Sequence, residues 1–69
     1  MRLSTRNQLV GTVSAVKSGA VMTVVTVQLD GGQSVTASIT KDATEELELE
    51  VGKPVTALVK PTEVMLGVE

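Results

Sequence analysis

Residues 21–40 read VMTVVTVQLDGGQSVTASIT, and this stretch decides the fold class. Apolar and polar side chains alternate on both sides of Asp30-Gly31-Gly32, as they do in strands with one buried face. An Asp-Gly pair between two such runs is a strong signal for a β-hairpin. We therefore predict antiparallel strands at Val21–Leu29 and Gln33–Thr40. Met22 and Val24 make the second face of the first strand partly apolar, as expected where another subunit covers it.

The same patterns extend to the rest of the chain. The predicted elements are, in order, a strand at Asn7–Val16, a turn at Lys17–Ala20, the hairpin, a short helix that Asp42 caps and that ends before Leu49, a strand with Val55, Ala57 and Val59 on one face, and a fifth strand with Val64, Leu66 and Val68. This is the element order of the OB-fold, a partly open Greek-key barrel. We expect one domain over residues 1–69, mainly β, built as an OB-like five-stranded barrel with one short helix between strands 3 and 4.

Size and composition predict self-association. The chain has 69 residues and no cysteine, histidine or aromatic residue. A domain this short buries only about 60% of the surface that its unfolded chain exposes, and such domains are usually stabilised by disulfides, metals or other subunits. Because the chain has no Cys or His, it has no disulfide and no ligands for structural zinc. We therefore expect a homo-oligomer whose hydrophobic core is shared between copies.

The same inventory argues against catalysis. Acid–base and nucleophilic catalysis usually rely on His or Cys, so we expect no enzyme, no cofactor and no bound metal ion. The acidic residues near the predicted helix fit a solvated surface better than a carboxylate site; they are Glu45, Glu46, Glu48 and Glu50.

Nucleic acids and membranes are also poor candidates as partners. Proteins that bind single strands combine a basic groove with aromatic platforms, whereas this chain has no aromatic residue and a net charge of −2. No apolar run approaches the roughly 20 residues that span a bilayer. The N-terminus lacks the apolar region of a signal peptide. We expect a cytoplasmic protein with no nucleic-acid and no membrane partner.

The few basic residues include two in informative contexts. Arg6 lies in the polar run Ser4-Thr5-Arg6-Asn7-Gln8, directly before an apolar strand, and Lys60 ends the fourth predicted strand. An arginine fork, a lysine charge, hydroxyls and backbone N–H groups are the parts needed to hold a small tetrahedral dianion. On composition alone, ordinary surface charges and turn residues are the favoured interpretation of the same positions.

A family resemblance changes that balance. The run Ser4-Thr5-Arg6-Asn7-Gln8-Leu9-Val10-Gly11 closely resembles the Ser-Ala-Arg-Asn-Gln-Leu-x-Gly opening of the molbindins, small molybdate- and tungstate-binding proteins built from a Mop domain. The resemblance spans essentially the whole chain, with further matches at Lys17-Ser18-Gly19-Ala20-Val21, Gly31-Gly32-Gln33, Ser38-Ile39-Thr40, Glu45-Glu46-Leu47 and Lys60 through Gly67. It implies an OB-like barrel that assembles as a hexamer, a trimer of dimers, with strands shared between subunits and oxyanions at the interfaces.

The resemblance also implies site residues. One site would use the Ser4 hydroxyl, the Thr5 backbone N–H, the Arg6 guanidinium and Lys60, with backbone N–H groups from the glycine turn of a second subunit. The full set of oxyanion-binding candidates is Ser4, Thr5, Arg6, Lys60, Gly19 and Ala20, with Ser38 and Thr40 for a second class of site.

Two residues depart from the family pattern. Thr5 replaces the usual alanine and adds a hydroxyl beside the anion. Pro61 follows the lysine where the family has alanine or serine, and proline has no N–H to donate.

The function implied is reversible binding and storage of molybdate or tungstate in the cytoplasm. Two alternatives remain open at this stage. One is an anion-sensing regulatory or interaction module, because the same domain type occurs in transcription regulators and transporter ATPases. The other is a structural oligomer that binds no ligand, for which Pro61 is the warning sign.

Overall fold

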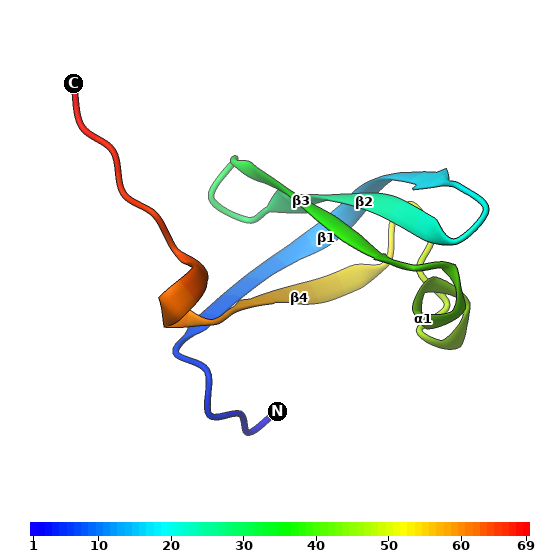
Figure 1. Ribbon diagram of the computed structural model, residues 1–69, viewed down its shortest axis with the longest axis horizontal. Helices are drawn as coiled ribbons and strands as arrows, with labels where there is room; N and C mark the ends of the chain where they lie inside the picture. The colour runs from blue at the N-terminus through cyan, green and yellow to red at the C-terminus, as the bar shows by residue number, and fades with distance from the viewer.

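The fold is one curled antiparallel sheet with a short helix at one end (Figure 1). A computed structural model describes residues 1–69. The elements are β1 (Asn7–Ser18), β2 (Met22–Leu29), β3 (Ser34–Thr40), α1 (Lys41–Glu46), β4 (Pro54–Val59) and a 3₁₀ turn at Pro61–Glu63. The strand order in the sheet is β3-β2-β1-β4. The predicted mainly β architecture, with one short helix between the third and fourth strands, is confirmed.

The predicted hairpin is the β2–β3 pair. Its register runs from Met22 opposite Thr40 to Gln28 opposite Ser34. Two backbone bonds close the turn: the amide of Leu29 donates to the Gln33 carbonyl, and the amide of Gly32 donates to the Leu29 carbonyl. Gly32 adopts a φ of 99°, a conformation that glycine reaches without steric cost. The alternation and the turn chemistry are local, so the sequence predicts them well.

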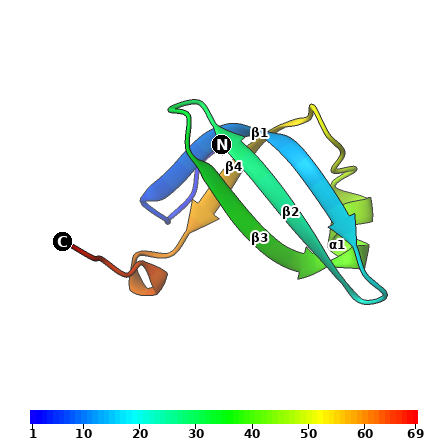
Figure 2. The same cartoon turned by 90° about the horizontal axis from the view of Figure 1, so that it is seen from above.

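Strand β1 connects the two halves of the sheet. Its first half pairs with β4, from Asn7 opposite Val59 to Thr12 opposite Pro54, and its second half pairs with β2. The β1–β2 register shifts between Val13 and Ala15, and a bulge of this kind bends a strand and increases its twist. Figure 2 shows the result: β3, β2 and β1 lie side by side, with α1 at one end.

The core of the chain is small. Only six of 69 residues are buried, and its centre is Val13, Val25 and Val27. Partly buried side chains surround these three valines; they are Val16, Leu29, Val35, Ile39, Leu49 and Val55. Three buried valines are a thin core for a chain of this length.

The helix begins earlier than the sequence predicts. The expected N-cap was Asp42, but the N-cap is Thr40, whose side-chain oxygen accepts a bond from the Ala43 amide at 3.1 Å. Thr40 is both the last residue of β3 and the cap, with φ −68° and ψ 151°. Strand and helix therefore follow each other without a loop, and Asp42 falls in the first helical turn.

The predicted fifth strand does not form, so the sheet of one chain has four strands. Val64 has extended backbone angles, with φ −91° and ψ 127°, but residues 64–69 pair with no strand. Leu66 is 95% exposed and Val68 is 99% exposed. Figure 1 shows this segment running away from the sheet after the 3₁₀ turn. A strand needs a partner for its backbone groups, and the tail meets no sheet edge in its own chain.

The two edge strands border an apolar groove. The groove has a volume of about 370 Å³, and 12 of its 14 lining residues are hydrophobic. Val35, Ala37 and Ile39 of β3 line one side, and residues 55–59 of β4 line the other. The groove therefore lies between the two edges of the four-stranded sheet.

Candidate functional site

The N-terminal segment and Lys60 lie at the same end of the sheet. Asn7 pairs with Val59 at the end of the β1–β4 ladder. Just before it, the Thr5 hydroxyl donates to the Val59 carbonyl at 3.0 Å, across 54 positions of sequence. The chain therefore brings Ser4-Thr5-Arg6 beside Val59, the residue that precedes Lys60. Figure 1 shows the start of β1 next to the end of β4.

The groups gathered there are mostly hydrogen-bond donors without partners. The side chains of Ser4, Arg6 and Lys60 are exposed and take part in no hydrogen bond within the chain. The backbone amides of Thr5 and Arg6 also make no backbone bond. A guanidinium, an ammonium, a hydroxyl and two amides are suited to the oxygens of an anion.

Two polar groups of Thr5 make hydrogen bonds within the chain. The hydroxyl, which the resemblance places beside the anion, donates to the Val59 carbonyl. Its own carbonyl accepts a bond from Gln8 Nε2 at 3.1 Å. The backbone amide of Thr5, the group assigned to the anion, makes no bond.

Pro61 fixes the backbone next to Lys60. Proline disfavours helical angles in the residue before it, and Lys60 has the extended values φ −64° and ψ 136°. The Lys60 carbonyl accepts from the Glu63 amide at 2.9 Å, which closes the 3₁₀ turn. The proline thus removes one donor but holds Lys60 in a defined backbone conformation.

The glycine turn lies at the other end of β1 (Figure 1). The amide of Gly19, a candidate donor, is not available because it bonds to the Met22 carbonyl at 2.8 Å. The amides of Ala20 and Val21 make no bond within the chain. Ala20 remains a candidate, and the Val21 amide is a further one that the sequence analysis does not name. The sequence does not show which amides of the turn are free, because the Gly19 bond forms only in the folded turn. One chain does not bring this turn to Lys60.

The residues of the second candidate site have different environments. The Thr40 hydroxyl accepts a hydrogen bond from the Ala43 amide and so caps α1. Ser38 is exposed on β3 opposite Val24, and its hydroxyl makes no hydrogen bond within the chain. Neither residue makes a hydrogen bond to the segment that holds Ser4 and Arg6.

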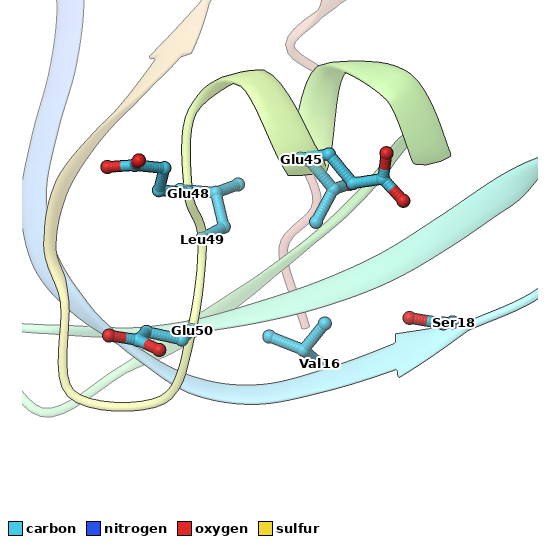
Figure 3. A pocket seen from close by; sticks show the side chains of 7 residues that line it. Val16, Ser18, Glu45, Glu48, Leu49 and Glu50 are labelled. Atoms are coloured by element: carbon cyan, nitrogen blue, oxygen red, sulfur yellow. The ribbon is translucent and has the colours of Figure 1, made fainter.

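A separate hollow of about 590 Å³ lies beside α1. Its lining includes the acidic residues Glu45, Glu48 and Glu50. Figure 3 shows the carboxylates of Glu45 and Glu48 pointing away from each other, and no cluster of carboxylates in the chain is arranged to hold a metal ion. Negative charges on this wall repel an anion, so the hollow is not part of the candidate site.

Fold and site together define a small, OB-like β domain with exposed basic side chains and unpartnered hydrogen-bond donors at one end of its sheet. The TOBE domain family matches residues 3–66, and the chain therefore belongs to that family. A probable molybdenum-pterin-binding protein of Haemophilus influenzae is 42% identical over 69 residues, covering all of both chains. The molybdenum transport protein ModE of Herbaspirillum seropedicae is 49% identical over 67 residues; they cover 97% of this chain but only 25% of ModE.

Two solved structures share the fold. MopII from Clostridium pasteurianum superposes with a TM-score of 0.92 at 40% identity, covering 97% of this chain and all of MopII. The cytoplasmic molybdate-binding protein ModG, with molybdate bound, gives a TM-score of 0.95 at 45% identity, covering all of this chain and 49% of ModG. The resemblance to the Mop-domain proteins and the OB-like fold are thereby confirmed.

No helix of the chain has the length and apolar character to cross a membrane.

Proposed function

We propose that this chain is a non-catalytic protein that binds molybdate, or tungstate, reversibly and stores it in the cytoplasm. The observation that carries the proposal is the Thr5–Val59 hydrogen bond, which holds Ser4 and Arg6 next to Lys60. The likeness to a molybdate-bound ModG structure supports molybdate as the ligand. Storage is the part of the proposal that rests on the family resemblance.

The chemistry of the cluster matches a tetrahedral dianion. Arg6 and Lys60 supply two positive charges, and every other group assigned to the site is a donor. An anion that carries a proton, such as hydrogen phosphate, brings an O–H that meets no acceptor there, which disfavours it. Sulfate has the same charge and acceptors as molybdate. The two anions must therefore be separated by the size of the cavity that we propose forms between the assembled copies.

One chain supplies half of the proposed site. The Ala20 and Val21 amides, the donors proposed for the other half, lie at the opposite end of β1 and must come from a second copy. A homo-oligomer supplies such pairs by symmetry, and we propose a hexamer built as a trimer of dimers. An anion bound only by the assembled form also stabilises the assembly by mass action.

The exposed C-terminal segment supports this assembly. Val64, Leu66 and Val68 alternate along an extended tail without a partner, while the apolar groove between β3 and β4 has no strand in it. If the tail of one copy lies in the groove of another, the tail gains a pairing partner and the groove is covered. The strand predicted from sequence would then form between chains.

A regulatory module is the second candidate function. The chain matches only a quarter of ModE, so the same domain forms one part of a longer molybdenum transport protein. In that role, anion binding at the same residues would change the activity of an attached domain or an associated protein. A structural oligomer without a ligand is the third candidate, and the experiment below separates it from the other two.

The proposal is tested by replacing the cluster's arginine. Arg6→Ala removes a charged donor, and such a bond contributes about 1.5–3 kcal/mol, so the molybdate dissociation constant should rise roughly ten- to hundred-fold. Arg2→Ala, in the same exposed N-terminal segment, is the matched control and should bind like the unmodified protein. Calorimetric titration measures both, and light scattering checks that the oligomer is intact. If Arg6→Ala and Arg2→Ala bind molybdate with equal affinity, Arg6 is not part of the binding site.

A further inference from the structure

The carbonyl of Val59 accepts two side-chain hydrogen bonds. Thr5 Oγ1 donates to it at 3.0 Å and Asn7 Nδ2 donates to it at 3.0 Å. Asn7 lies within β1 and is already held by its ladder position opposite Val59. Thr5 lies before the first residue of β1. The Thr5 hydroxyl therefore ties to β4 a segment that the ladder itself does not hold.

Thr5 is held through two of its polar groups. Its hydroxyl binds Val59, and its carbonyl accepts from Gln8 Nε2. Thr5 is half-buried, whereas Ser4 and Arg6 on either side are exposed and carry side chains without partners. Fixing Thr5 limits the positions that these two side chains can reach.

We propose that the Thr5 hydroxyl is a positioning group for the oxyanion site, an inference that rests on the proposed function. It holds the Ser4–Arg6 segment against the end of β4 before the anion arrives. A site that is already ordered loses less conformational freedom on binding, which strengthens binding. Lys60, at the end of β4, is ordered too, because Pro61 restricts its backbone.

The test compares Thr5→Val, which removes the hydroxyl but keeps the branched shape, with Thr5→Ser, which keeps the hydroxyl. Loss of one hydrogen bond corresponds to about a five-fold change in an equilibrium constant. Thr5→Val should therefore raise the molybdate dissociation constant about five-fold, and Thr5→Ser should restore it. Ser14→Ala is the matched control: it removes a hydroxyl that donates to the Thr26 carbonyl at 3.2 Å, away from the cluster. It should leave molybdate affinity unchanged.

A second readout does not depend on the anion. Backbone order parameters of residues 4–6 in the anion-free protein, measured by NMR relaxation, should be lower in Thr5→Val than in the unmodified protein and Thr5→Ser. Unchanged order parameters in Thr5→Val, or a Thr5→Ser variant as defective as Thr5→Val, overturn the proposal. A lowered melting temperature in Thr5→Val with unchanged molybdate affinity assigns a merely structural role and also overturns it. If the unmodified protein binds no molybdate, the proposed function fails separately, and the order parameters alone decide whether the hydroxyl holds the segment.

Discussion

Gly11 lies where three strands meet. It pairs with Leu29 of β2 and with Val55 of β4, and it is buried. A Cβ at this position would lie 2.4 Å from the Gln28 carbonyl oxygen and 2.8 Å from Val27 Cγ1. The backbones of β1 and β2 can approach this closely only because residue 11 has no side chain.

Replacing this glycine should therefore destabilise the protein. Gly11→Ala forces β1 and β2 apart, and overpacking of this kind costs about 1–3 kcal/mol. Urea denaturation at a fixed protein concentration measures the loss. Gly31→Ala is the control, because a Cβ there meets nothing within 4 Å, and its effect should stay within about 0.5 kcal/mol. Equal stabilities of the two variants would show that the close approach at Gly11 is not needed.

The site illustrates how far single residues can be predicted. Arg6 and Lys60 are far apart in sequence, and no spacing rule brings them together; only the family resemblance did so before the structure. The β1–β4 register supplies the physical reason, since Asn7 opposite Val59 places both at one end of the sheet. The sequence does not show that the Gly19 amide and the Thr5 hydroxyl donate hydrogen bonds within the chain, because both bonds depend on the folded register.

Among the elements, the first three strands follow from local signals to within two residues at each end, whereas the start of the helix and the C-terminal strand do not. The β2–β3 hairpin rests on alternation and an Asp-Gly turn, both visible within 20 residues. The helix cap was misplaced by two residues because β3 runs directly into α1 at Thr40. The fifth strand was predicted from the alternation of Val64, Leu66 and Val68, but alternation describes only the faces of a strand. Whether the strand forms depends on a partner, which a single chain does not supply.

The C-terminal segment provides a prediction at this scale. In the proposed exchange, Leu66 enters an apolar groove of another copy, and a buried unpaired charge there is costly. Leu66→Asp should shift the oligomer toward smaller species. Met65→Asp places the same charge on the alternate face of the segment and should do so much less. Light scattering during size-exclusion chromatography measures both masses. A Leu66→Asp variant that keeps the mass of the unmodified protein would rule out docking of this segment.

The thin core and the incomplete site of a single chain both support our proposal that the protein assembles from several copies. A single chain has three buried valines, an apolar groove and an exposed apolar tail, and we propose that other copies complete its core. The donors at Lys60 and at the glycine turn lie at opposite ends of β1, so the proposed site is also completed between copies. The composition leads to the same expectation, because short chains without disulfides or metals are usually stabilised by other subunits. The proposal that the site is shared between copies depends on the strand register, which cannot be derived from composition.

We propose that the assembled protein selects a tetrahedral dianion by size and charge. The most direct test is calorimetric titration of the purified oligomer with molybdate, and with sulfate as the matched anion, at an ionic strength of about 0.15 M, where weak surface attraction is screened. We predict saturable binding of molybdate and little heat with sulfate. If neither molybdate nor tungstate binds to protein shown to be folded and oligomeric, the chain is not an oxyanion-binding protein, and a structural or partner-binding role is left.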